Sequence, residues 1–152
     1  MYAADASLEG YAVVEAETQP STEWIHDTGL VHTTHAARVM RSKRWRLRRQ
    51  KWFRYELKKI LLGEICAFRH AAMTAARENR GKEVIIYTDN SNVYHAIQKG
   101  RSRSKPLNVL CRNILFLELT YQVRIHARWC PSACMPADKY TRKATYPGCK
   151  YK

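Results

Sequence analysis

The chain has 152 residues, which suits one domain over residues 1–152, and its 45% hydrophobic content excludes a disordered chain. With 27 Lys and Arg against 13 Asp and Glu, the formal net charge is +14, so polyanions are the expected partners. No run approaches the roughly 18 apolar residues of a membrane span. The start resembles no secretory signal, and five cysteines, an odd number, favour reduced thiols. We therefore expect no membrane contact and an intracellular location, cytoplasmic or nuclear.

The first half of the chain predicts a meander followed by two helical stretches. A short first strand carries Asp5, a second strand covers 10–17, and a third comes from within 23–33. Eleven of the 24 residues in 36–59 are Lys or Arg, and Pro and Gly are absent. This composition predicts a basic helical insertion at about 36–56. Apolar residues then recur at three- and four-residue steps from Tyr55 to Arg80, which predicts a long amphipathic helix.

The second half predicts βα units. A β-rich run at 84–88 predicts a central strand, followed by a helix that Asn90 or Ser91 can cap. A basic loop spans 99–105, and the last predicted elements are a helix over 107–119, a strand over 123–129 and a helix from Pro136. The order β-β-β-α-β-α-α-β-α predicts an α/β fold. Its sheet would be mixed and five-stranded, an antiparallel meander plus parallel strands, flanked by helices.

Four acidic residues stand where a carboxylate can be presented for chemistry: Asp5, Glu64, Asp89 and Asp138. Glu64 falls on the apolar stripe of the long helix, where an unpaired carboxylate is costly unless it is protonated or binds a metal. Asp89 ends a strand, the place where ligand sites of open α/β sheets gather. Together the four supply the oxygen ligands that Mg²⁺ prefers.

Each acid also has a simpler explanation, which the sequence leaves open. Glu64 could reach solvent at the edge of its helix, and Asp89 could be a helix N-cap. Asp5 could belong to an ordinary turn, and Asp138 could be a first-turn acid that interacts with the helix dipole. The physical pattern alone therefore suggests a divalent-metal site without specifying one.

Four stretches make the interpretation specific. They are Asp5–Ser7 with Gly10, Glu64–Ala67, Tyr87–Asn90, and Pro131–Ser132 with Ala137–Arg142. These stretches resemble the ribonuclease H domain of retroelement polyproteins, of the type in long-terminal-repeat-like and tyrosine-recombinase retrotransposons. The resemblance covers nearly the whole chain and places the four acids on the four metal-binding carboxylates of that family. Two departures are Met135–Pro136, where the family usually has an Asn, and a Cys130–Pro136 loop without histidine.

The resemblance implies an endonuclease that hydrolyses the RNA strand of RNA/DNA hybrids with two Mg²⁺ ions, or Mn²⁺ instead. Asp5 would bridge the ions, Asp138 would hold the one that activates water, and Glu64 and Asp89 would hold the one at the leaving 3′ oxygen. The implied setting is retroelement reverse transcription, with an adjoining reverse transcriptase domain in the parent polyprotein. Candidate contacts to the hybrid are small polar and basic residues: Ser7, Asn90, Asn92, Arg44, Arg46, Arg48, Arg49, Lys99, Arg101 and Arg103.

Alternatives remain for the basic segment and for the function. The segment is interpreted as a phosphate-binding region, and the alternatives are a solvated helix or a nuclear-localisation-like run. The chain could also be a non-catalytic ribonuclease-H-like module that binds nucleic acid, or an integrase-like or resolvase-like nuclease that acts on DNA. Retention of four acids argues against the module, because clustered negative charge does not help to bind phosphate. The Pro-Ser and Ala-Asp tail favours ribonuclease H over a DNA nuclease.

Overall fold

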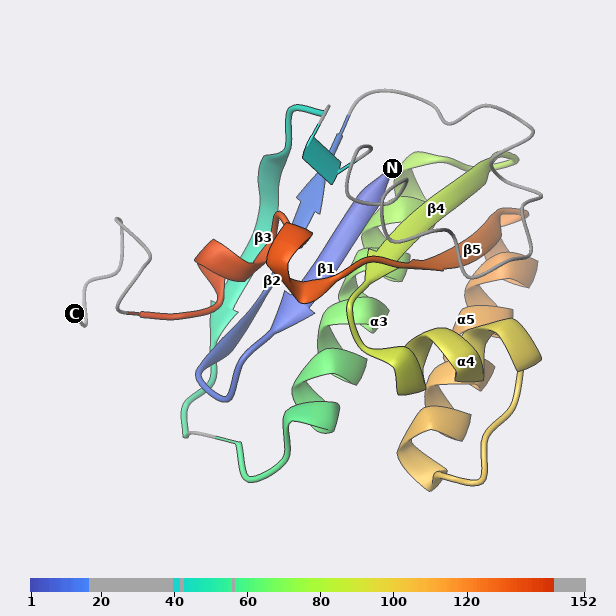
Figure 1. Ribbon diagram of the computed structural model, residues 1–152. Coiled ribbons are helices and arrows are strands. Elements are labelled where there is room, and N and C mark those ends of the chain that lie inside the picture. The colour runs from blue at the N-terminus through green and yellow to red at the C-terminus, as the bar shows by residue number, and fades with distance from the viewer. Residues whose placement is uncertain (17–39, 42, 56, 144–152) are drawn as a thin grey trace.

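Five strands form one mixed sheet in the order β3-β2-β1-β4-β5 (Figure 1). The computed structural model describes residues 1–16, 40–41, 43–55 and 57–143. The strands are β1 (Tyr2–Ala6), β2 (Gly10–Glu15), β3 (Arg46–Trp52), β4 (Glu83–Thr88) and β5 (Arg124–Trp129). The strands β1, β2 and β3 pair antiparallel, whereas β4 runs parallel to both β1 and β5. The predicted combination of a meander with parallel strands is confirmed.

Helices cover one face of this sheet (Figure 1). They are α3 (Ile60–Glu78), α4 (Ser91–Lys99) and α5 (Lys105–Tyr121), and two short 3-10 turns follow β5 at Ser132–Cys134 and Asp138–Tyr140. No helix in the described part of the chain is long and apolar enough to cross a membrane. The chain after β5 returns across the opposite face, so both faces of the sheet are covered.

The hydrophobic core accordingly has two parts. On the helical face, Tyr11 and Val13 of β2 pack with Phe68 of α3 and Leu110 of α5. On the other face the core is smaller and joins strand residues to the chain after β5: Ala3, Val14, Ile85, Tyr87, Cys130, Met135 and Ala137. Burial on both faces explains why the β4 sequence is a continuous apolar run rather than an alternating one.

Small residues let α3 approach β1 closely. The buried face of α3 consists largely of alanines, which are fully buried: Ala67, Ala71, Ala72, Ala75 and Ala76. A Cβ added to Gly63 would lie 3.1 Å from the Cβ of Ala6, which is tighter than ordinary van der Waals contact. Because Gly63 precedes Glu64, this contact determines how near the Glu64 carboxylate comes to the end of β1.

The prediction of a basic helical insertion at 36–56 is wrong over Arg46–Trp52, which form β3 at the edge of the sheet. Pairing with β2 places Leu47 opposite Val14, in the smaller part of the core. A local composition of long basic residues is compatible with a helix, but pairing with β2 overrides that weak preference. The third meander strand expected within 23–33 lies outside the described residues.

Ion pairs at one end of β3 attach it to the rest of the fold. Arg46 and Arg48 both contact the carboxylate of Glu15 on β2, and Arg48 also contacts Glu78 at the end of α3. The Tyr2 hydroxyl donates to the same Glu78 carboxylate at 3.2 Å. These two arginines are therefore structural partners of carboxylates.

Two predicted helix boundaries also change. The long helix begins at Ile60 rather than Tyr55, because Lys59 is extended and the Leu57 amide donates to the Leu8 carbonyl at 2.9 Å. The helix expected from Pro136 is, among the described residues, only a 3-10 turn. The strands β2, β4 and β5 and the helix α5 lie within two residues of their predicted ends.

Replacing Gly63 by Val should destabilise the fold by about 1–3 kcal/mol, because the added atoms would push α3 away from Ala6. Valine has a higher helix propensity than glycine, so a loss cannot come from the helix itself. Urea unfolding followed by circular dichroism measures the change. The control is Arg77→Val on the exposed side of α3, which should cost less than about 1 kcal/mol. Equal losses in the two variants would contradict the close contact.

Candidate metal centre

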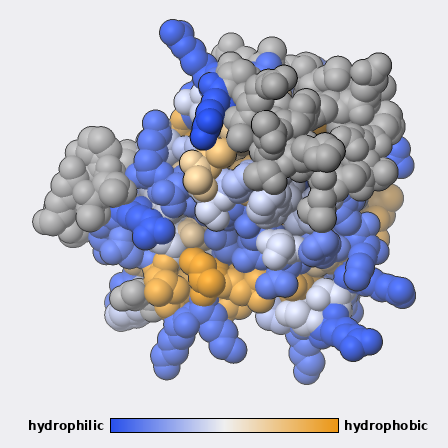
Figure 2. Space-filling model, in the orientation of Figure 1, coloured by the Kyte–Doolittle hydropathy of each residue, from blue (hydrophilic) through white to orange (hydrophobic). Residues whose placement is uncertain are grey.

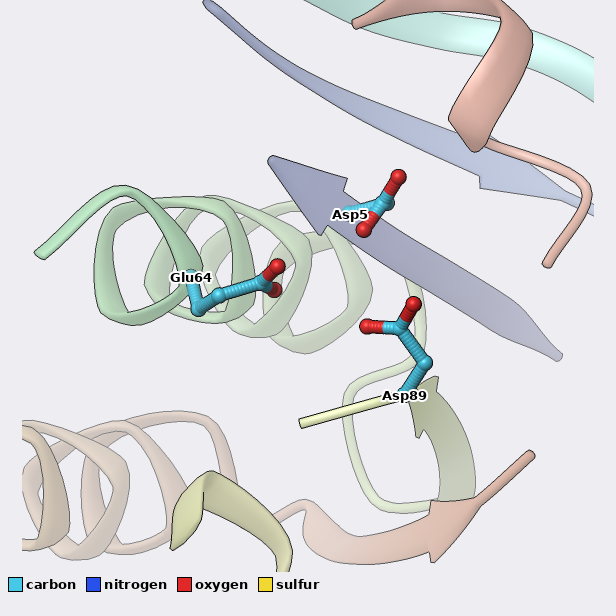
Figure 3. Close-up of side chains that lie close together, drawn as sticks. All are labelled: Asp5, Glu64 and Asp89. Carbon is cyan, nitrogen blue, oxygen red and sulfur yellow. The ribbon is translucent and has the colours of Figure 1, made fainter. Parts of the chain in front are cut away.

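Three carboxylates meet where β1, β4 and α3 come together. Asp5 lies near the end of β1, Asp89 follows β4, and Glu64 is on the first turns of α3. Their oxygens lie within 4.8 Å of one another, and the side chains point toward a common space (Figure 3). Parallel pairing puts the carboxyl ends of β1 and β4 at one edge of the sheet, and the Gly63 contact brings Glu64 to the same place.

The three acids are strongly perturbed. Asp5 is 3% exposed and Glu64 is 5% exposed. Burial, reinforced by the neighbouring carboxylates, raises the pKa of Asp5 to about 8 and that of Glu64 to about 9. Burial also raises the pKa of Asp89. Among the described residues, the Oε2 atom of Glu64 has no hydrogen-bond partner.

These properties fit a divalent cation. One buried carboxylate oxygen has no hydrogen-bond donor, and the three neighbouring acids repel one another when they are ionised. Without a bound cation, the ionised state of these carboxylates is therefore unfavourable. A hard cation such as Mg²⁺ or Mn²⁺ prefers oxygen ligands and would compensate this charge. The residues present therefore suit such an ion.

Asp138 is outside the tight group but borders the same cavity. This cavity has a volume of about 560 Å³, and all four predicted acids line it. The Asp138 side chain is 49% exposed, and its Oδ1 lies 3.7 Å from Nε of Arg142. The structure therefore brings the four acids to one cavity, three of them tightly and Asp138 at its exposed side.

The structure removes three of the simpler explanations. Asn90, not Asp89, caps α4, since its Oδ1 accepts from the Val93 amide at 3.0 Å. Glu64 is too buried to be a solvent-reaching edge residue. Asp5 pairs with Ala12 inside the sheet and does not belong to a turn. Asp138 does begin a 3-10 turn, so the first-turn explanation for it stays open.

The predicted nucleic-acid contacts separate into three places. Ser7 lines the carboxylate cavity, but its hydroxyl already donates to the Thr141 carbonyl and accepts from the Glu9 amide. A second cavity, of about 1070 Å³, is bordered by four of the predicted residues, Asn92, Lys99, Arg101 and Arg103. Arg46, Arg48 and Arg49 lie in β3, and Arg44 just before it, at the opposite edge of the sheet from β5.

Some residues at these cavities were not among the predicted site residues. Lys58 and Arg142 line the carboxylate cavity, and His95 lines the second one. The spacing of Arg142, four residues after Asp138, was the available indication for that cation. Lys58 belongs to the basic run at 36–59, where no local sequence feature distinguishes it from the other basic residues.

Exposed apolar side chains surround part of the carboxylate cavity. Leu8 and Ile60, which line it, are 36% and 43% exposed. Figure 2 shows an apolar area across the lower part of this face, with hydrophilic side chains around it. An apolar area of this kind next to charged groups is typical of a surface that contacts another molecule.

Comparison with known proteins finds matches among solved structures. No protein-family model matches the chain, and no curated protein matches it. Ribonuclease H1 from the halophilic archaeon Halobacterium salinarum is similar in structure, with a TM-score of 0.53 and 15% identity over 94% of both chains. The chain has a ribonuclease-H-like fold. The N-terminal ribonuclease H domain of Rv2228c from Mycobacterium tuberculosis agrees, with a TM-score of 0.56 and 13% identity over 95% of both chains.

In the absence of divalent ions, the thermal stability should fall as the pH rises from about 5 to about 8. The folded state holds the protons of Asp5 and Glu64 more tightly than the unfolded state does. This stabilisation is complete below the ordinary carboxyl pKa near 4, and it is lost as the pH rises through about 8 and 9. A fall of at least about 2–4 °C in Tm, equivalent to about 1 kcal/mol, is expected in EDTA.

Scanning fluorimetry measures this fall, and Glu64→Gln is its control. The Gln side chain cannot ionise, so the variant should lose less Tm between the two pH values. Adding Mg²⁺ should restore more Tm to the wild type at the higher pH than at the lower. The same pH dependence in both proteins, with no response to Mg²⁺, would exclude the carboxylate group as its cause.

Proposed function

We propose that the chain is a metal-dependent endonuclease that hydrolyses the RNA strand of RNA/DNA hybrids. The observation that carries the proposal is the buried group of Asp5, Glu64 and Asp89 on a chain with net charge +14. A surface that only binds phosphate gains nothing from three buried acids, whereas a metal-dependent hydrolase needs them. The fold shared with ribonucleases H supports the same activity.

The carboxylates have distinct roles in this proposal. Two Mg²⁺ ions, or Mn²⁺, would supply Lewis-acid activation of the phosphate and of the attacking water. Asp5 would hold both ions, Glu64 and Asp89 the one on the side of the leaving 3′ oxygen, and Asp138 the one on the side of the water. Asp138 suits that side because its side chain is 49% exposed and water can reach it. The products would carry 5′-phosphate and 3′-hydroxyl ends.

Substrate contacts would come from groups around the two cavities. Lys58 and Arg142 bring positive charge next to the carboxylates, where a phosphate would lie. Asn92, Lys99, Arg101 and Arg103 border the second cavity and would contact the sugar-phosphate backbone farther along the hybrid. Selection of RNA would depend on 2′-hydroxyls in the wide minor groove rather than on base edges.

We place the activity in a retroelement, as the resemblance of the acidic motifs suggests. There it would remove the RNA template after reverse transcription, next to an adjoining reverse transcriptase domain. The Thr-Asp-Asn end of β4 and the Pro-Ser and Ala-Asp tail support this setting.

Cleavage of a labelled RNA/DNA hybrid tests the proposal. The wild type should cut the hybrid with Mg²⁺ or Mn²⁺, and EDTA should abolish cutting. Asp89→Asn should slow it by at least about 100-fold, because a ligand of the ions is lost. Glu83→Gln is the matched control, since it changes a carboxylate at the opposite end of the same strand, paired with Arg124, and should keep the activity.

Duplex DNA and duplex RNA are compared in the same assay. Equal cutting of duplex DNA would indicate a DNA nuclease of the same fold. Tight, salt-sensitive binding of the hybrid without cutting under any ion would indicate a non-catalytic binding module.

A further inference from the structure

Three exposed cations gather between β3 and α3, away from the two cavities. Arg49 and Lys51 come from β3, and Arg69 comes from α3. The strand register pairs Lys51 with Tyr11 and Arg49 with Val13, two residues whose side chains lie on the helical face of the sheet. We refer to Arg49, Lys51 and Arg69 as the basic cluster.

Two aromatic rings lie beside the basic cluster and hold part of it in place. The rings of Tyr11 and His70 stack with centroids 4.9 Å apart and an interplanar angle of 4°. Arg49 donates from Nε to the Tyr11 hydroxyl at 3.0 Å. Burial lowers the pKa of His70 to about 4, and the three cations of the cluster add to this effect. His70 is therefore neutral at pH 7, and the positive charge belongs to the cluster alone.

The basic cluster differs from the other end of β3 in having no compensating acid. Among the described residues, none of its three members forms an ion pair with a carboxylate. Arg46 and Arg48, only a few residues earlier, pair with acids of β2 and α3. Three neighbouring positive charges repel one another, so the fold keeps a local field that favours an anion.

The basic cluster is close to the metal centre. Ala6, next to Asp5, pairs with Tyr11, which pairs with Lys51, so two strand spacings of about 4.8 Å separate Lys51 from β1. Arg69 follows Glu64 by five residues on α3, about 7.5 Å along the helix axis. The two routes give about 10 Å and about 7.5 Å, which correspond to about two to three base steps of 3.4 Å in a nucleic-acid strand.

We propose that Arg49, Lys51 and Arg69 bind the phosphodiester backbone of the same nucleic acid that is engaged at the metal centre, about two to three nucleotides away. The inference rests on the proposed function, because it takes the hybrid as the ligand of that centre. It also divides the basic segment into two parts. The end of β3 that carries Arg49 and Lys51 contacts phosphate, whereas Arg46 and Arg48, which form ion pairs with acids, hold the strand in the sheet.

The salt dependence of binding tests the proposal. The cluster variant Arg49→Gln/Lys51→Gln/Arg69→Gln is compared with Arg77→Gln/Arg80→Gln/Arg124→Gln, which removes the same charge from exposed positions elsewhere. The full chain is titrated with a fluorescent hybrid of about 20 base pairs in EDTA, between about 50 and about 200 mM KCl. The slope of log affinity against log salt should fall by about 2 in the cluster variant and by less than about 0.5 in the control.

Equal changes of slope in the two variants, or no change in either, would overturn the proposal. Circular dichroism verifies that both variants are folded before binding is compared. The binding measurement requires no cleavage, so it decides the role of the basic cluster even if the chain has no nuclease activity.

Cleavage kinetics give an independent measurement if the wild type is active. The cluster variant should raise KM for the hybrid by about 10-fold and leave kcat unchanged, because the cluster contacts a part of the strand that does not react. A lower kcat at unchanged KM would place the cluster in the chemistry and contradict a backbone-binding role.

Discussion

Close packing of α3 on β1 determines how deeply the carboxylates of the site are buried and how close together they lie. Gly63 removes the side chain that would hold the helix away from Ala6, and the alanine face of α3 continues the same close approach along the sheet. Glu64 is thereby buried beside Asp5 and Asp89, where the carboxylates lose hydration and their oxygens lie within 4.8 Å of one another. Their raised pKa values are the electrostatic consequence, and a divalent cation is the partner that would relieve it.

Positive charge is distributed unevenly around this negative centre. At one end of β3, Arg46 and Arg48 are tied to Glu15 and Glu78 and serve to hold an edge strand. At the other end, Arg49 and Lys51 face α3 without pairing with an acid and lie near the three carboxylates. A net charge alone could not distinguish these two groups, because the difference is made by the acids that the tertiary structure brings to each.

The sequence predicted the elements whose patterns are local. The apolar run of β4 and the amphipathic pattern of α5 were each recognised to within two residues. Glu64 was singled out by its position on an apolar stripe, and the structure finds it buried. The prediction failed for β3, because Leu47, which packs against the core, stands among long basic side chains next to a β-bulge, and these conceal the alternation of a strand.

By itself, the sequence determined the composition of the site: which acids the chain carries, that each belongs to a different segment, and that the chain is strongly basic. Only the tertiary structure decided that Asp5, Glu64 and Asp89 lie within 4.8 Å while Asp138 stands at the exposed side, and which arginines are paired. The reason is that periodicity and capping depend on residues near in sequence. Distances between elements depend instead on sheet pairing and on helix packing between segments that lie dozens of residues apart.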